Sequence, residues 1–209
     1  VVPLGIDLAG FTAQPRADDE GLRAALGVRA PYLLWLGTVL GRRLPREVLE
    51  AFAGLRSERP ELQLVIAGAN RMREPQRLQA WISELGLQGA VLAPGWVGEA
   101  TLAPLYRGAE LGVYVSRHEG FGIPPLECLA CGTPVVASSG LALDELWPDY
   151  PFRCREASAA SILATVREAL ADRDRTRSVL ERAARLLEGQ DWEASSRRLV
   201  AELRRAVPA

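Results

Sequence analysis

Short apolar runs alternate with longer amphipathic segments along this 209-residue chain. The apolar runs are rich in aliphatic and β-branched residues and have the length of buried strands. The amphipathic segments repeat apolar residues at helical spacing, as Leu78, Trp81, Ile82 and Leu85 do. The pattern predicts an α/β fold of about six strands alternating with helices, a Rossmann-like doubly wound parallel sheet with helices on both faces.

The predicted elements are joined by short connections. Strands are expected at residues 32–36, 62–67, 90–93, 111–115, 134–137 and 152–154. Helices are expected at residues 17–27, 46–55, 74–85, 99–107, 126–131, 141–146, 158–170, 173–187 and 192–206. Asp18, near the start of the first of these helices, and Asp191, just before the last, are expected to cap them. Ligands bind beyond the carboxyl ends of strands in such sheets, and five residues that follow strand ends can converge there: Arg43, Gly68, Val97, Glu119 and Glu127.

The composition suits one globular domain with a substantial core, because 48% of the residues are hydrophobic. The net charge of −1 gives no electrostatic reason to expect a nucleic-acid partner. No apolar run is as long as a membrane-spanning helix. All 25 basic residues are Arg, so Arg must do any work that Lys usually does.

Three cysteines are present: Cys128, Cys131 and Cys154. The first two form a C-x-x-C pair, which can indicate a redox or metal site. A zinc site would want two further ligands, and His118 is the sole His, so buried small apolar side chains are expected instead. Three cysteines form no disulfide framework, which favours a reducing compartment such as the cytoplasm.

Residues 111–139 contain the most informative pattern, with the sequence LGVYVSRHEGFGIPPLECLACGTPVVASS. It predicts a strand, a turn with Gly120 and Gly122, a helix with Pro124 and Pro125 in its first turn, and a second strand. A helix N-terminus suits a phosphate group, and glycines let the backbone approach a ligand closely. The pattern is therefore typical of a phosphate-binding βαβ unit.

Two carboxylates flank this turn. Glu119 lies within it, and Glu127 follows eight residues later, about one turn into the helix. Carboxylates are poor phosphate ligands but good acceptors for sugar hydroxyl groups. The alternative is a solvated loop acid at Glu119 and a surface helix acid at Glu127.

This segment resembles the E-x7-E region of retaining GT-B glycosyltransferases, most closely family four. The matching residues are EGFGIPPLE, from Glu119 to Glu127, and ACGTPVV, from Ala130 to Val136. The resemblance extends over nearly all of the chain. It implies that the chain is the C-terminal, donor-binding half of a GT-B fold.

The first residues, VVPLGID, resemble the linker between the two GT-B domains. On this basis residues 1–10 are expected to be a remnant of that linker, and residues 11–209 the donor-binding domain. The N-terminal domain is expected to have been removed, and the chain alone to transfer no sugar. The alternative is an ordinary edge strand that has lost its initiator Met.

The resemblance also implies roles for individual residues. Arg43 takes the place of the basic residue that contacts the donor diphosphate, and Glu119 binds the hydroxyls of the transferred sugar; these two are the candidate catalytic residues. Glu127 is expected to bind the ribose. Thr38 stands where some members carry a second Arg, which puts one phosphate contact in question. The backbone amides of four residues are expected to hold the diphosphate and sugar: Gly120, Phe121, Gly122 and Ile123.

Other candidate donor-binding residues come from neighbouring loops. Trp96 and Val97 fall in a turn where backbone groups usually meet the base, and Trp96 either stacks on the base or packs in the protein. His118 is expected to be structural or to contact the sugar, and is not taken as a catalytic base. The remaining candidates precede or follow the strand ends: Gly37, Arg42 and Gly68.

The implied function is retaining transfer of a sugar, with mannose as one candidate, from a nucleotide-diphosphate sugar to a glycan or lipid-linked acceptor. The N-terminal domain would supply the acceptor site, and peripheral membrane association of the full protein is compatible with a lipid-linked acceptor. Neither a metal nor a cofactor is expected, since protein cations take that role in the family.

Two other classes of function compete with this interpretation. One is a non-catalytic nucleotide-binding or regulatory module, because a domain without its partner could bind a ligand only. The other is a different GT-B enzyme such as an epimerase or a phosphorylase. A phosphorylase would carry pyridoxal phosphate on a Lys, and the chain contains none.

Overall fold

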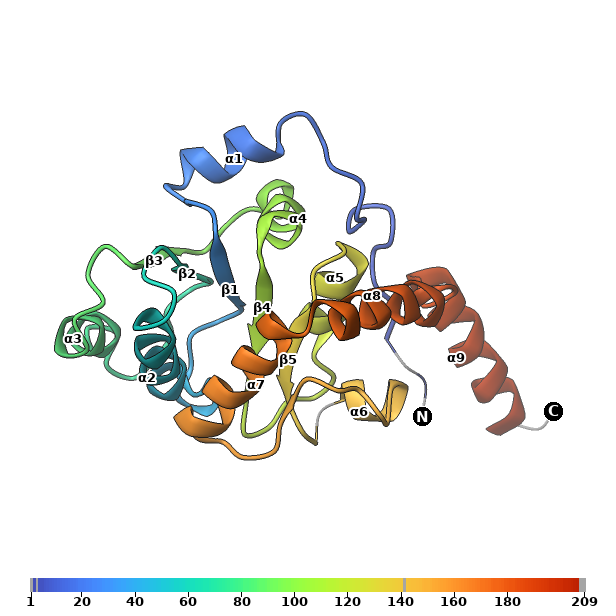
Figure 1. The fold of residues 1–209 in the computed structure, drawn as a ribbon. Helices are drawn as coiled ribbons and strands as arrows, with labels where there is room; N and C mark the ends of the chain where they lie inside the picture. The colour runs from blue at the N-terminus through green and yellow to red at the C-terminus, as the bar shows by residue number, and fades with distance from the viewer. Residues whose placement is uncertain (1, 3, 141, 207–209) are drawn as a thin grey trace.

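The computed structural model describes residues 2, 4–140 and 142–206, and in this part of the chain the strands form one parallel sheet. The order of the six strands is β3-β2-β1-β4-β5-β6 (Figure 1). Their bounds are Tyr32–Leu36 for β1, Gln63–Ala67 for β2, Val91–Gly95 for β3, Leu111–Tyr114 for β4, Val135–Ser138 for β5 and Arg153–Cys154 for β6. The predicted Rossmann-like sheet is confirmed.

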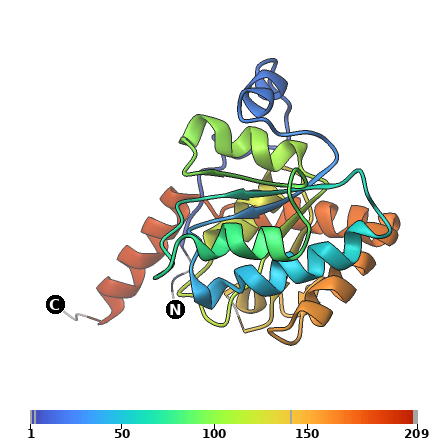
Figure 2. The same ribbon diagram turned by 90° about the vertical axis from the view of Figure 1, so that its left-hand side faces the viewer.

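Helices cover both faces of the sheet, and in Figure 2 α4 and α1 lie above it while α2 and α3 lie below. The bounds are Asp19–Ala25 for α1, Pro45–Arg56 for α2, Arg77–Glu84 for α3, Glu99–Gly108 for α4, Ile123–Ala130 for α5, Ala142–Leu146 for α6, Ala159–Ala171 for α7, Arg173–Leu187 for α8 and Trp192–Ala206 for α9. A short 3-10 turn, η1, spans Gly41–Arg43. No described helix is long and apolar enough to cross a membrane.

The two predicted caps have different outcomes. Asp191 caps α9, since the amide of Ala194 donates to its Oδ1 atom at 2.7 Å. Asp18 lies at the start of α1 but makes no capping bond, so that prediction is wrong. Its backbone is already helical, and the neighbouring Asp19 accepts from the amide of Arg16 at 3.2 Å instead.

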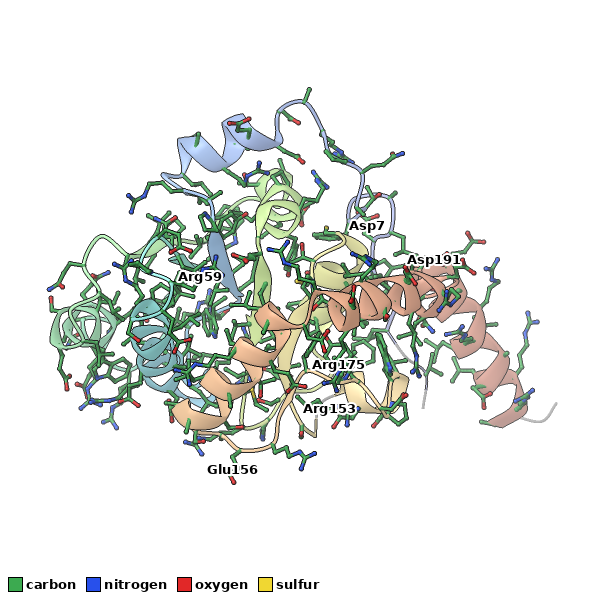
Figure 3. All side chains as sticks on the ribbon, in the orientation of Figure 1. Asp7, Arg59, Arg153, Glu156, Arg175 and Asp191 are labelled. Carbon is green, nitrogen blue, oxygen red and sulfur yellow. The ribbon has the colours of Figure 1, made fainter. Side chains whose placement is uncertain are left out.

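The helix α3 begins later than expected. α3 starts at Arg77 because residues 74–76 form a turn, in which the amide of Arg77 bonds to Glu74 O at 3.1 Å. α6 starts at Ala142, and Leu141 lies outside the described residues. In the segment expected to be a linker remnant, Ile6 is buried and forms a parallel bridge with Asp191, labelled in Figure 3. Residues 1 and 3 of that segment lie outside the described part.

The cysteines lie inside the core, as predicted. All three are free thiols and buried, and Cys128 fits against Gly112 of β4, where a Cβ atom would lie 2.6 Å from the sulfur. Burial raises the pKa of Cys131 to about 12 and that of Cys154 to about 11. The thiols therefore stay protonated, and among the described residues no group of three or more His, Cys, Asp or Glu could hold a metal ion.

Candidate functional site

The candidate site lies where the strand order reverses between β1 and β4. These strands are parallel neighbours, with Trp35 opposite Val113, so the loops at their carboxyl ends lie side by side. A direct main-chain bond joins the two loops, from the amide of Arg117 to Arg42 O at 2.8 Å. This is the point at which open α/β sheets bind their ligands.

Arg42 and Arg43 both bind Glu119 across this junction. Arg43 Nε donates to Glu119 Oε1 at 2.8 Å, and Arg43 Nη2 reaches Oε2 at 3.4 Å. Arg42 Nη1 donates to the same Oε1 atom. The Glu119 side chain is only 7% exposed, so it is not a solvated loop acid. The structure thus brings the two predicted catalytic residues into direct contact.

The charge on Glu119 is stable in this setting. Burial disfavours the carboxylate, but the bonds from Arg43 and Arg42 outweigh that cost and leave the pKa of Glu119 below its ordinary value. Tyr114, at the end of β4, lies under the Arg43 guanidinium, which is 5.4 Å from the centre of its ring. Burial raises the pKa of Tyr114 to about 12, so its hydroxyl remains protonated.

Two glycines make room for Arg43. Gly37 has a φ of +129°, and a Cβ atom there would lie 2.0 Å from Arg43 Nη1. Gly68 has a φ of +153°, and its Cβ atom would lie 2.0 Å from Gly37 O. The carbonyl of Thr38 faces the same guanidinium, with Arg43 Nη1 at 3.4 Å. Gly37 and Gly68 therefore hold the loop geometry that places Arg43.

The glycine turn leads directly into α5. Gly122 occupies the N-cap position with a φ of +83°, and no side chain caps the helix there. A side chain at Gly122 would also crowd Tyr114, whose ring lies 3.3 Å from the Cβ position. Phe121 and Ile123 are half-buried and pack against the core. Pro124 and Pro125 carry no N–H, so the backbone amides at this helix start are those of Ile123 and of the turn before it.

Glu127 lies on α5 beside a separate cavity of about 360 Å³. The hydroxyl of Tyr106 donates to Glu127 Oε2 at 3.0 Å. Burial raises the pKa of Glu127; the Tyr106 bond opposes this shift, and the charge of Asp7 adds to it. Asp7 and Phe11 of the N-terminal segment and Glu99 of α4 also line the cavity. Glu127 is therefore a partly buried acid that lines this cavity.

The remaining candidates surround these groups. Trp96 is 75% exposed in the turn between β3 and α4, so the expectation that it packs in the protein is wrong, while Val97 is buried. His118 is exposed, and its main-chain oxygen accepts from Arg42 Nη1 and from Ser116 Oγ, each at 2.9 Å. Gly120 has open space around its Cβ position.

Comparison with known proteins decides the family. A model described as glycosyl transferases group 1 matches residues 23–186 of this chain. The chain belongs to the group 1 glycosyl transferases. A relative in this group, a D-inositol 3-phosphate glycosyltransferase of Arthrobacter sp., is 35% identical over 204 residues, which cover 94% of this chain and 47% of that protein. The chain thus spans about half the length of the curated relatives it matches.

Solved structures of other proteins have a similar fold. Sucrose-phosphate synthase from Thermosynechococcus elongatus matches 98% of this chain and 52% of its own, with a TM-score of 0.76 and 26% identity. HepE from Anabaena, in complex with UDP-glucose, matches 95% of this chain and 55% of its own, with a TM-score of 0.82 and 21% identity.

Sequence reasoning missed several contacts of this group 1 site. It did not pair Arg42 or Arg43 with Glu119, place Tyr114 beneath Arg43, or connect Tyr106 to Glu127. Tyr106 lies on α4 and Glu127 on α5, so their bond joins residues on different helices. No spacing pattern reports such a contact, because helix packing alone brings the two side chains together.

Proposed function

We propose that this chain is the donor-binding half of a retaining glycosyltransferase and that it binds a nucleotide-diphosphate sugar beyond β1 and β4. The observation that carries this proposal is the cluster of Arg42, Arg43 and Glu119 beside the uncapped start of α5. It combines fixed positive charge, free backbone amides and an ionised acceptor within one junction.

The diphosphate is assigned to Arg43 and to the backbone amides from Gly120 to Ile123, in the turn that leads into α5. Arg can bind phosphate oxygens in bidentate fashion and stays charged at all working pH values. Negative charge grows on the diphosphate as the bond to the sugar breaks, and preorganised donors stabilise it at that moment. Arg43 would therefore act on the leaving group without help from a metal ion or cofactor.

The two carboxylates are assigned to different parts of the donor. Glu119 would accept hydrogen bonds from the hydroxyls of the transferred sugar, because it is ionised and adjoins the phosphate-binding groups. Glu127 would accept from the ribose, since it faces the neighbouring cavity. Exposed Trp96 offers a ring on which a base can stack, with Val97 and Gly68 in the adjacent turns.

The class of reaction follows from the intact E-x7-E spacing, which supports retention of the anomeric configuration. A hexose is the expected cargo, with mannose as one candidate, and a glycan or lipid-linked molecule is the expected acceptor. The acceptor half of the site is assigned to a second unit. Such a unit would correspond to the part of the relatives that lies outside their match to this chain. Three free thiols support a reducing compartment, the cytoplasm, as the place of reaction.

Calorimetric titration of the chain with GDP, UDP and ADP tests the proposal. At least one of them should bind, and Arg43→Ala should weaken that binding because a charge-assisted contact to the diphosphate is lost. Arg46→Ala is the matched control, since Arg46 lies just beyond the loop and is exposed. Failure of all three nucleotides to bind at millimolar concentration would count against the proposal. If the chain binds a nucleotide but transfers no sugar even when a second unit is joined to it, a regulatory module would be favoured.

A further inference from the structure

Arg42 connects the two loops of the site through a single nitrogen. Its Nη1 atom donates to His118 O at 2.9 Å and to Glu119 Oε1, and it lies 3.4 Å from Ser116 Oγ. The Arg42 side chain is 38% exposed, whereas the carboxylate that it binds is almost fully covered. All of these contacts are to the β4–α5 loop, so the guanidinium points toward Glu119 and the residues just before it, Ser116 and His118.

The proposed function places conflicting demands on Arg43 and Glu119. They bind each other at 2.8 Å, yet one is assigned to the diphosphate and the other to the sugar. Their contact must loosen when the donor enters. Arg43 then keeps the hydroxyl of Tyr114, at 3.4 Å from Nη2, and the carbonyl of Thr38 as partners. Glu119 keeps Arg42.

We infer, on the basis of the proposed function, that Arg42 is a positioning residue, which keeps Glu119 ionised and directed toward the sugar while Arg43 turns to the diphosphate. A covered carboxylate that lost both arginines would be costly, because a buried charge needs a partner. Arg42 removes that cost. It acts on the sugar through Glu119 and does not contact the phosphates.

The two loops are also joined by bonds that do not involve the Arg42 side chain. The bond from the amide of Arg117 to Arg42 O involves the main chain only, and Ser116 Oγ also reaches Arg42 O at 3.3 Å. A variant at position 42 therefore keeps the loop register, and thermal unfolding can verify that it is folded. Arg42→Lys retains the charge but not the planar fork, so it should restore part of the function.

The decisive measurement compares nucleotide sugars with bare nucleotides. The probes are GDP-mannose, UDP-glucose and ADP-glucose beside GDP, UDP and ADP, titrated into the unaltered chain and its variants. Arg42→Ala should weaken binding of the nucleotide sugar by about tenfold, the equivalent of one charge-assisted hydrogen bond, and change bare nucleotide binding by less than about twofold. Arg117→Ala is the control, because Arg117 is an exposed arginine of the same loop that pairs with Glu47.

A double-mutant cycle separates positioning from direct contact. If Arg42 acts through Glu119, then Arg42→Ala should change sugar-dependent affinity by less than about twofold in a chain that already carries Glu119→Gln. The pH dependence gives a second readout. The charged and titratable groups around Glu119 are Arg42 and Arg43, both in the β1–α2 loop, and Tyr114 at the end of β4. His118 precedes Glu119 in the chain. Arg42 is one of the two arginines whose bonds lower the Glu119 pKa, so without it the pKa should rise and sugar-dependent affinity should be lost at a higher pH on acidification.

Each contrary result has its own meaning. Equal weakening of bare nucleotides and nucleotide sugars would show that Arg42 binds phosphate, and would overturn the inference. Additive effects of Arg42→Ala and Glu119→Gln, or an unchanged pH midpoint, would overturn it as well. Binding of nucleotides without any contribution from the sugar would also overturn it. Failure of the unaltered chain to bind any nucleotide would overturn the proposed function itself.

Discussion

Arg43 Nε and Glu119 Oε1 lie 2.8 Å apart, although 76 positions separate the two residues in the sequence. The contact joins the loops that follow two neighbouring strands and pairs two opposite charges. It is also shielded, since neither side chain is more than slightly exposed.

Glu119→Gln should make the chain less stable at neutral pH and less sensitive to acid. The pKa of Glu119 is lowered in the folded chain, so its stabilising effect is complete above the ordinary pKa of a glutamate, about 4.3, and is lost as the pH falls through the lowered value. We expect a loss of about 1.5 kcal/mol in unfolding free energy at pH 7. Urea unfolding from pH 7 to pH 3 should show the difference shrinking. Glu193→Gln, at an exposed pair with Arg197, should change little, and a constant difference for Glu119→Gln would contradict the argument.

Glu127→Ala should weaken binding of a ribonucleoside diphosphate more than Glu119→Ala does, because only Glu127 is assigned to the ribose. The expected loss is about 1.5–3 kcal/mol, the range for a hydrogen bond to a charged group. The same titration with the 2′-deoxy nucleotide should show a smaller effect of Glu127→Ala. A larger effect of Glu119→Ala on the bare diphosphate would reverse the two assignments.

Gly68→Ala should destabilise the chain by more than about 1 kcal/mol, from its positive φ alone. The added Cβ atom would also meet a backbone oxygen, which cannot swing aside as the end of a side chain can. Denaturant unfolding measures the loss. Gly41→Ala, in the η1 turn with open space around it, is the matched control and should be close to neutral.

The exposed apolar face of α9 should matter only when a second unit is present. Leu199 is 49% exposed and Leu203 is 55% exposed. Replacing both by Ser should leave the melting temperature of this chain unchanged, because little apolar area is buried there. The same change should lower the melting temperature of a longer protein in which this chain is joined to the second unit. Equal effects in both settings would argue against an interface on this helix.

Transfer of sugar should require that second unit. Retaining transfer needs the acceptor hydroxyl held against the anomeric carbon, and positioning supplies a large part of the rate. The chain should therefore show little transfer from labelled nucleotide sugars to a panel of acceptors. Adding the second unit should raise the rate, and comparable rates with and without it would contradict this expectation.

The sequence was sufficient for the fold because periodicity reports burial directly. Tyr32–Leu36 and Arg173–Leu187 have the predicted bounds, since apolar runs and helical spacing decide both. The prediction of a cap at Asp18 was wrong because the neighbouring carboxylate of Asp19 accepts the hydrogen bond in this turn. The sequence alone does not decide which of two adjacent Asp residues makes that bond. The local sequence pattern thus predicts which helices and strands form better than it predicts the residues at which they begin.

The site was predicted less completely than the fold. Arg43, Glu119 and Glu127 could be named because their motifs are local in the chain. The partners of these residues could not, since Tyr114, Tyr106 and the double contact of Glu119 with Arg42 arise from packing between distant segments.

The three buried thiols also make this chain suitable for spectroscopic labelling. Cys128, Cys131 and Cys154 are covered, and their raised pKa values keep them protonated and unreactive toward maleimides. A cysteine introduced at the exposed position 117, in the β4–α5 loop, would then be the single accessible thiol in the described part of the chain. A dye attached there would report donor entry by fluorescence, without removal of any natural cysteine.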